Sequence, residues 1–239
     1  PFLWIHFSGA GKISIRKGGS VDFSFIRRFA PMYFDAARLT LGIAALGILF
    51  SVLIGALCSV TEYYKLPVLR RIASAYVELS RNTPLLVQLF FLYFGLPKLG
   101  IRMSSGLCGV VGLSFLGGAY MTESFRAGLE AVEGVQREAA LSLGLTPLQS
   151  MGYVIFPQAL ALSVPSLVAN MIFLIKETSV FSAIALADLM YVAKDLIGLY
   201  YQTEEALFML VLSYLVLLLP ISILGTLLER RLRYAGFGD

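Results

Sequence analysis

The sequence predicts an all-α membrane protein with five transmembrane helices. Of its 239 residues, 58% are hydrophobic and only 14% are charged, and the mean hydropathy is +0.80. A soluble domain is about 45–50% apolar and about 25% charged, and a globule of this length would leave much of this apolar surface exposed to water. The composition therefore excludes a soluble enzyme, a disordered tail and a coiled coil.

Five segments are free of charged residues and long enough, or nearly so, to cross a bilayer as a helix of about 20 residues. The predicted spans are residues 39–60, 83–97, 103–122, 159–175 and 206–228. The second and fourth are the shortest. The third is rich in glycine, which lets helices approach closely within a bundle.

Two segments between the spans are also expected to be ordered. Gln136–Gly144 predicts a short helix that Gly144 ends, with Pro147 soon after it. Thr178–Ala187 is apolar but too short to cross a membrane, so a half-helix or re-entrant element is expected there.

The charge distribution predicts the domain boundary and the orientation. Residues 1–30 are expected to form a tail on the membrane interface, and residues 31–239 the transmembrane domain. With the C-terminus inside, the inner segments carry nine Lys or Arg residues and the outer loops four, although the tail adds six to the outside. The positive-inside rule is counted over short loops next to the spans, so the basic residues of the loops count more than those of the tail. We therefore expect an outer N-terminus and a cytoplasmic C-terminus.

Several kinds of chemistry are absent from the sequence. His6 is the single histidine, which excludes a histidine metal site and a Ser-His hydrolase. Residues 9–14 resemble a phosphate loop, but the motif needs Gly at His6 and Ser or Thr at Ile13. The predicted spans hold no Asp, Glu, Lys, Arg or His, which argues against a proton relay. The net charge of +4 comes from basic residues beside apolar runs, which favours contact with lipid headgroups over nucleic acid.

The most informative stretch is residues 136–157, between the third and fourth spans. Here Glu138, Ala139 and Ala140 are followed by Gly144 and then by Pro157. A loop that passes force to another protein needs a short rigid helix with a flat face, and two alanines keep that face small. An Ala-rich interfacial helix without such a role would have the same composition.

This stretch resembles the EAA loop of bacterial ABC-importer permeases, whose pattern is E-A-A-x3-G-x9-I-x-L-P. The spacing is intact, and Val154 and Phe156 stand where the family has Ile and Leu. The resemblance implies a type I ABC-importer permease fold in a bacterial inner or plasma membrane. It also implies that this loop is a coupling helix seated on a cytoplasmic ATPase. The residues assigned to coupling are Glu138, Ala139, Ala140, Gly144 and Pro157.

Three further blocks resemble the permeases of polar amino-acid uptake. Residues 78–88 resemble E-x-x-R-G-T-P-L-L-V-Q, with Asn82 in place of Gly, and residues 119–128 resemble A-Y-x-x-E-x-x-R-x-G. Residues 174–179 resemble the turn L-K-D-T-S. The candidate substrate pathway is Gln88, Tyr93, Asn170, Thr178 and Ser179. The candidate structural or gating residues are Arg81, Thr83, Pro84, Glu123 and Arg126.

Each of these residues also has a purely structural interpretation. Arg81 could be a solvated interface charge, and Pro84 could simply kink the start of a helix. Gln88, Tyr93 and Asn170 could make polar contacts between helices. Glu123 and Arg126, three residues apart, could form a surface ion pair on one helix face.

The resemblance also implies the partners of the chain. These are a dimer of cytoplasmic ABC ATPases, a second permease subunit of the same or a related sequence, and an extracytoplasmic amino-acid-binding protein. The chain is expected to be non-catalytic and to hold no metal or cofactor, with ATP and magnesium bound by the partner ATPase. The alternatives are a stand-alone secondary carrier or channel and a membrane scaffold.

The positions of the charged residues indicate the charge of the substrate. A permease that binds a cationic side chain should place a carboxylate within its spans, and the predicted spans hold none. A neutral or zwitterionic amino acid such as glutamine or cystine is therefore expected. We also expect a half-helix near Lys176–Ser179 to point its N-terminal dipole at the substrate carboxylate.

Overall fold

The computed structural model describes residues 4–7, 13–16 and 22–236, and the side chains of residues 22–231. The first described elements are two short antiparallel strands, β1 (Trp4–Phe7) and β2 (Ile13–Arg16), with Trp4 opposite Arg16. The glycine-containing segment 9–12, which resembled a phosphate loop, lies outside the described residues. The helices that follow are α1 (Phe23–Tyr63), α2 (Pro67–Arg81), α3 (Leu85–Phe90), α4 (Ser105–Ala131), α5 (Gly134–Ser142), α6 (Pro147–Ser150), α7 (Phe156–Glu177), α8 (Leu189–Tyr200) and α9 (Thr203–Gly236).

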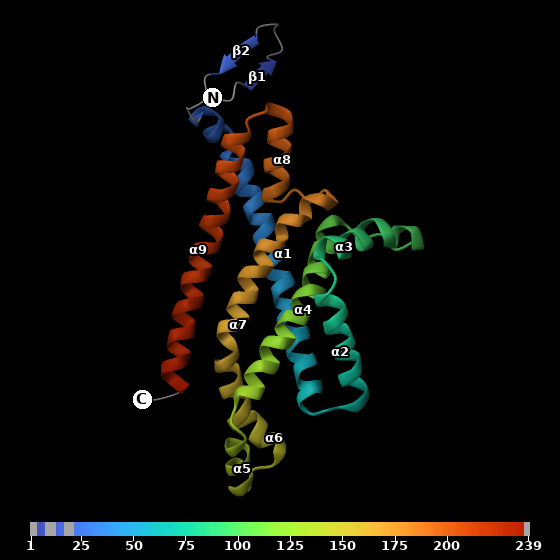
Figure 1. Cartoon of the computed structure of the whole chain (residues 1–239), viewed down its shortest axis with the longest axis vertical. Coiled ribbons are helices and arrows are strands. Elements are labelled where there is room, and N and C mark those ends of the chain that lie inside the picture. Colours follow the sequence, from blue (N-terminus) through green and yellow to red (C-terminus); the bar gives the residue numbers. More distant parts are fainter. Residues whose placement is uncertain (1–3, 8–12, 17–21, 237–239) are drawn as a thin grey trace.

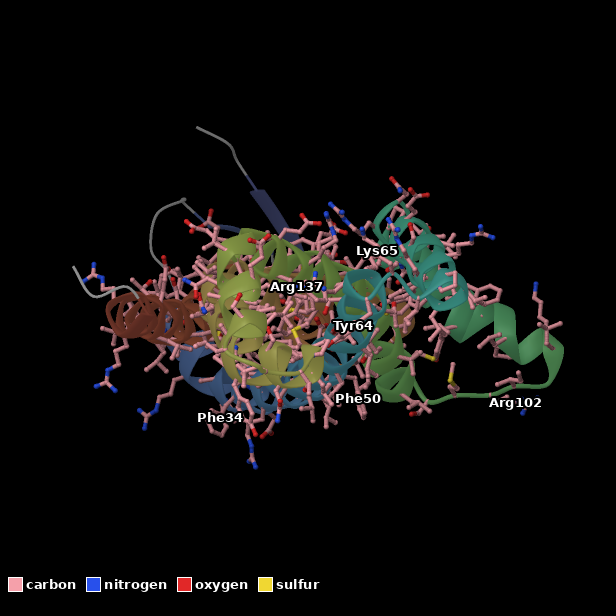
Figure 2. All side chains as sticks on the ribbon, turned by 90° about the horizontal axis from the view of Figure 1, so that it is seen from below. Phe34, Phe50, Tyr64, Lys65, Arg102 and Arg137 are labelled. Carbon is pink, nitrogen blue, oxygen red and sulfur yellow. The ribbon has the colours of Figure 1, made fainter. Side chains whose placement is uncertain are left out.

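The long helices confirm the predicted all-α membrane class. Four helical segments of the described chain are long and apolar enough to cross a bilayer: Phe23–Tyr63, Ser105–Ala131, Pro147–Ile184 and Thr203–Arg231. They run roughly along the long axis of the molecule (Figure 1). Phe34 and Phe50 on α1 point outward from the bundle, as side chains that face lipid would (Figure 2), and both are exposed.

The second of the five predicted spans is shorter in the structure than the other four. Residues 83–97 fall in a helical segment of 15 residues, Leu85–Leu99, made of α3, a π-helical turn and a 3₁₀ turn. Residues 67–81, which lie between the first two predicted spans, form α2. Pro84 separates the two because it has no backbone N–H and restricts the residue before it. In Figure 1, α2 runs alongside α4, and α3 turns away from the bundle.

The main core lies where α4 packs on α1 and α7. Leu89, Leu113, Met121 and Leu174 are fully buried there. Ser51 of α1 donates from its Oγ to the carbonyl of Leu113 at 3.3 Å, a contact that only closely packed helices can make. Glycines on both helices permit this approach, as expected from the glycine-rich third span.

A second, smaller core lies at the N-terminal end of the bundle, where the start of α1 meets α8 and the start of α9. Phe25 and Phe29 are buried in it, and the hydroxyl of Tyr33 donates to the carbonyl of Ala206 at 2.8 Å. The first long helix begins at Phe23, capped by Asp22. Residues 23–30 belong to this helix; an interfacial position for the residues before them stays a prediction.

The segment after α7 differs from the expected half-helix. Residues Thr178–Ile184 form a 3₁₀ helix that continues directly from the C-terminal end of α7. The free N-terminal dipole expected near Lys176–Ser179 is therefore wrong, because the 3₁₀ helix there continues from α7 and has no free N-terminus. The next helix start is that of α8, where Asp188 accepts a hydrogen bond from the backbone N–H of Tyr191 at 2.9 Å.

Burial of Asp188 gives a testable pH dependence. This carboxyl is fully buried, one of its oxygens has no partner, and desolvation raises its pKa from 3.8 to about 6. The folded state then holds the proton more tightly than the unfolded state, so stability is greatest below pH 4 and falls as the pH rises to about 6. A pKa difference of about two units changes the free energy of unfolding by at most about 3 kcal/mol.

The measurement is thermal unfolding of the purified protein at pH 4 and pH 7. Asp188→Asn keeps an acceptor for the α8 N-terminus but removes the titration, so it should be more stable than the wild type at pH 7 and lose part of the pH dependence. Asp195→Asn, at an exposed position of the same helix, is the control. Equal pH profiles for the wild type and Asp188→Asn would contradict the prediction.

Candidate functional site

The loop between α4 and α7 projects from one end of the bundle, opposite the end that carries β1 and β2 (Figure 1). It contains α5, which begins two residues before the predicted start, Gln136, and the short α6. α5 packs on α6 and on the π-helical turn Met151–Ile155. The predicted short helix is thus confirmed, and it stands at the tip of the molecule.

The structure shows how the five residues assigned to coupling are arranged. Ala140 is buried, facing the loop, whereas Glu138 and Ala139 are exposed. Gly144 has φ +84°, the left-handed conformation that ends a helix, and Leu145 N–H donates to the Ala140 carbonyl at 3.2 Å. Pro157 lies in the first turn of α7, directly after the π-helical turn Met151–Ile155. The arrangement gives a rigid helix with an exposed polar and small-residue face.

An ion-pair cluster lies between this loop and the middle of the bundle. Arg126 contacts Glu123 at 2.6 Å, Glu130 at 2.9 Å and Glu62 of α1 at 3.8 Å. Arg81 of α2 reaches the same Glu123 at 3.5 Å. The expected ion pair between Glu123 and Arg126 is present, and the cluster links α1, α2 and α4.

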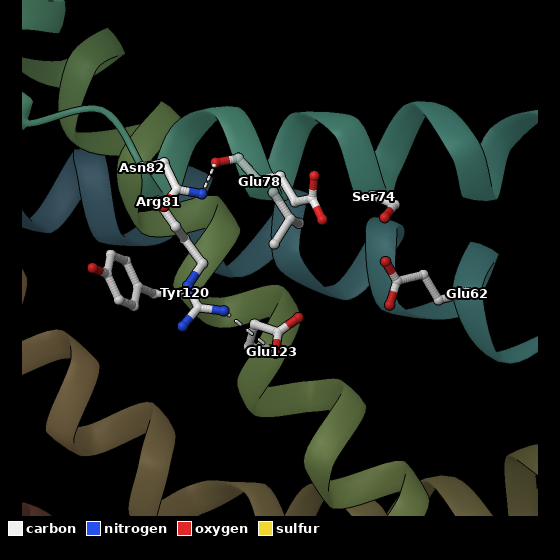
Figure 3. Close-up of a pocket in the computed structure, with 8 residues that line it drawn as sticks. Glu62, Ser74, Glu78, Arg81, Asn82, Tyr120 and Glu123 are labelled. Carbon is white, nitrogen blue, oxygen red and sulfur yellow. Dashed lines mark hydrogen bonds and ion pairs between the residues drawn. The ribbon is translucent and has the colours of Figure 1, made fainter.

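A cavity of about 430 Å³ opens beside this cluster (Figure 3). The guanidinium of Arg81 lies 5.5 Å from the ring centre of Tyr120 and close to Glu123. Across the cavity stand two further carboxylates, those of Glu62 and Glu78. The complete lining is Glu62, Ser74, Val77, Glu78, Arg81, Asn82, Tyr120 and Glu123. A neighbouring cavity of about 510 Å³ shares three of these residues and reaches Arg137 in α5.

Residues 83–88 form and stabilise the junction between α2 and α3. The side-chain amide of Gln88 donates to the carbonyls of Ser80 at 3.2 Å and Thr83 at 3.1 Å, at the C-terminal end of α2. Thr83 donates to the carbonyl of Leu79 at 2.7 Å, and Pro84 begins α3. These contacts give Gln88, Thr83 and Pro84 a positioning role, since they fix the direction of α3.

The other candidate pathway residues lie apart from the charged cavity. Asn170 donates to the Ser124 hydroxyl at 2.8 Å, which links α7 to α4. Thr178 is fully buried and donates to the carbonyl of Ile175 at 2.7 Å. Tyr93 and Ser179 are half-buried, and the ring of Tyr93 packs edge-on against Phe94. No cavity described here joins these four residues.

The sequence interpretation missed three residues of the cavity, Glu62, Glu78 and Tyr120, as members of one site. Glu62 lies two residues beyond the predicted first span and Glu123 one residue beyond the third, yet both lie within the observed long helices. The observed helices extend past the predicted spans, so these two carboxylates belong to long helices although neither lies in a predicted span. In the described part of the chain, no group of three or more His, Cys, Asp or Glu residues is placed to hold a metal ion.

Comparison with known proteins matches residues 30–234 to the family described as "Binding-protein-dependent transport system inner membrane component". The chain is 35% identical over 201 residues to a probable glutamine ABC transporter permease of Bacillus subtilis, covering 84% of this chain and 93% of the relative. It is 32% identical to an arginine transport system permease of the same species, covering 90% and 98%. It is 31% identical to a glutamine transport system permease of Escherichia coli K12, covering 89% and 98%.

The fold has solved counterparts. A chain of the crystal structure of an amino acid ABC transporter with histidines superposes with a TM-score of 0.83 at 35% identity, covering 89% of this chain and 100% of that one. A methionine ABC transporter in an inward-facing conformation, at 20% identity, shares the fold with a TM-score of 0.72. The chain therefore belongs to the family of binding-protein-dependent transport system inner membrane components, as a non-catalytic, multi-pass permease subunit of the polar amino-acid uptake type.

Proposed function

We propose that this chain forms part of the translocation pathway of an ATP-driven importer for a polar amino acid. The observation that carries the proposal is α5, an exposed helix at one end of the bundle that Gly144 ends in a left-handed turn. Such a helix is suited to move with a partner as a rigid unit. Two rigid arrangements of the pathway, biased differently by ATP and by substrate, then suffice for transport.

The partners follow from the same proposal. Two cytoplasmic ATPases, which bind ATP and magnesium, receive the coupling helices of two permease subunits. A second permease subunit of the same or a related sequence completes the pathway, and an extracytoplasmic binding protein delivers the amino acid. In support of this orientation, α9 ends toward the same side of the bundle as α5, and the strands lie at the opposite end (Figure 1). The coupling loop and C-terminus are then cytoplasmic, and the N-terminus is outside.

We propose a neutral, zwitterionic amino acid such as glutamine or cystine as the substrate. The charged cavity beside the ion-pair cluster supports this proposal. Arg81 can pair with an α-carboxylate, and Glu62, Glu78 or Glu123 with an α-ammonium group, so the lining carries both signs that an amino acid requires. The relatives include both glutamine and arginine permeases.

Replacement of Arg81 tests whether the cavity binds the amino acid during uptake. Arg81→Gln should raise the KM for uptake at least tenfold, because a hydrogen bond to a charged group contributes about 1.5–3 kcal/mol. Uptake of labelled amino acid into proteoliposomes that contain the complete importer is the measurement. Arg71→Gln, an exposed α2 residue outside this cavity, is the matched control. An unchanged KM in Arg81→Gln would show that the cavity does not bind the transported amino acid.

The overall function is tested by purification from native membranes in mild detergent. An ATPase that copurifies, and whose hydrolysis rises with binding protein and amino acid, is the expected result. Amino-acid uptake by this chain alone, without ATP, would overturn the proposal in favour of a secondary carrier or channel.

A further inference from the structure

A second cavity at the coupling end has a different chemistry. It measures about 310 Å³ and lies between the end of α1 and the loop that carries α5. Two cations, Lys65 and Arg137, share it with an apolar wall that includes Met151 and Ile155. Tyr63 and Tyr64 complete one side, with their rings 5.5 Å apart and nearly perpendicular. One end of this cavity is therefore cationic, and another is apolar and aromatic.

The two cations are available for an anionic ligand. Within the part of the chain that the structure describes, neither Lys65 nor Arg137 forms an ion pair with a carboxylate. Both residues are exposed, and Figure 2 shows Lys65, Tyr64 and Arg137 at the coupling end, seen from below. Arg126, by contrast, is already held by three glutamates.

The backbone at Lys65 gives an independent indication. Lys65 has φ +52°, and its N–H and that of Leu66 donate to the carbonyls of Glu62 and Thr61, both at 3.1 Å, closing the C-terminal end of α1. Glycine is the residue best suited to this left-handed position, and a residue with a side chain is strained there. The chain carries a lysine where the turn itself favours glycine.

An apolar stripe on α1 leads to this cavity. Along the helix, exposed apolar or aromatic side chains recur every three or four residues and so lie on one face. They are Leu46, Leu49, Leu53, Leu57, Val60 and Tyr64. The stripe ends beside Lys65. An acyl chain can lie along such a stripe while the headgroup remains at the membrane surface, where tyrosine and lysine are favoured.

We propose that this cavity binds the phosphate headgroup of an anionic phospholipid, with Lys65 and Arg137 as the phosphate ligands and the acyl chains on the α1 stripe. Lipid is favoured over a free phosphate because the cations are continuous with the apolar stripe and the tyrosine pair. The bound headgroup joins the fixed end of α1 to the coupling helix. Occupancy of the lipid site then depends on the position of α5 relative to the end of α1.

The test is native mass spectrometry of the purified, delipidated importer complex titrated with phosphatidylglycerol. Each surface cation contributes about 1 kcal/mol to binding of an anionic lipid, which is about fivefold in Kd at 1.4 kcal/mol per factor of ten. Lys65→Gly should therefore weaken the tightest phosphatidylglycerol site about fivefold. Because glycine suits the turn at residue 65, this variant should fold at least as well as the wild type. Lys65→Gly combined with Arg137→Gln should weaken the site about 25-fold.

Three results would overturn the proposal. An unchanged Kd for phosphatidylglycerol in Lys65→Gly would show that Lys65 does not bind the headgroup. Equal binding of phosphatidylcholine would exclude recognition of an anionic headgroup, and displacement of the lipid by millimolar inorganic phosphate would indicate a free-phosphate site. Lys98→Ala, which removes the same charge from an exposed position outside this cavity, should bind phosphatidylglycerol as the wild type does. A fivefold loss in that control would show that net charge alone is responsible.

Discussion

Gly144→Val should leave the chain folded and abolish most of the coupled ATPase activity of the importer. At φ +84° a residue with a side chain is strained by about 1–2 kcal/mol, and a β-branched residue by more. A Cβ at this position meets nothing within 4 Å, so the strain lies in the backbone and not in crowding. The chain relieves it by changing the turn, which displaces the exposed face of α5. We expect at least a tenfold loss of hydrolysis stimulated by substrate and binding protein.

Two control variants separate this conformational effect from the loss of a glycine as such. Gly134→Ala replaces a glycine in the same loop where a Cβ also meets open space but φ is not positive, so coupled hydrolysis should be retained. Gly144→Asn should be milder than Gly144→Val, because asparagine tolerates the left-handed region. If Gly144→Val and Gly134→Ala behaved alike, the left-handed turn would not be what positions the coupling helix.

Glu138→Ala tests the docking face itself. Glu138 is exposed and has no ion-pair partner among the residues that the structure describes, so its loss should not reduce the stability of the isolated chain. If α5 is the dock, copurification of the ATPase should fall while the thermal stability of the permease is unchanged. Retained copurification with normal stimulated hydrolysis would place the dock elsewhere.

The sequence predicted the long helices and the coupling helix well, for a physical reason. Apolar length is the main determinant of a membrane-crossing helix, and residues 103–122 and 206–228 have few alternatives in a bilayer. Likewise, glycine at residue 144 after an Ala-rich run is a local signal for a helix end, and the observed φ agrees. Both features depend on neighbouring residues alone.

Features that depend on distant residues could not be predicted in this way. α2 carries Arg70, Arg71, Glu78 and Arg81, so its hydropathy is that of a loop, and it is ordered by contact with α4: Tyr76 and Ser80 both donate to the carbonyl of Phe115, at 2.7 and 2.9 Å. The cavity has the same origin. Its carboxylates come from α1, α2 and α4, and only packing of these helices brings them together.

That packing depends on Gly55, where replacement by alanine should destabilise the chain. A Cβ at residue 55 would lie 2.5 Å from the Cβ of Met121 and 2.8 Å from backbone atoms of Met121 and Thr122. Backbone atoms cannot rotate away as a flexible side chain can, so α1 and α4 must separate. Overpacking of this kind costs about 1–3 kcal/mol, and Gly55→Leu should cost more.

Gly42→Ala is the matched control, since it lies on the same helix and its Cβ would meet nothing within 4 Å. Alanine is a better helix former than glycine, so this variant should be as stable as the wild type or slightly more so. Thermal unfolding and the monodisperse fraction after detergent extraction measure both variants. Equal stability of the two alanine variants would mean that α1 and α4 tolerate a wider separation. Because Glu62 of α1 and Glu123 of α4 line the same cavity, a separation in Gly55→Ala should also raise the KM for uptake in the molecules that remain folded.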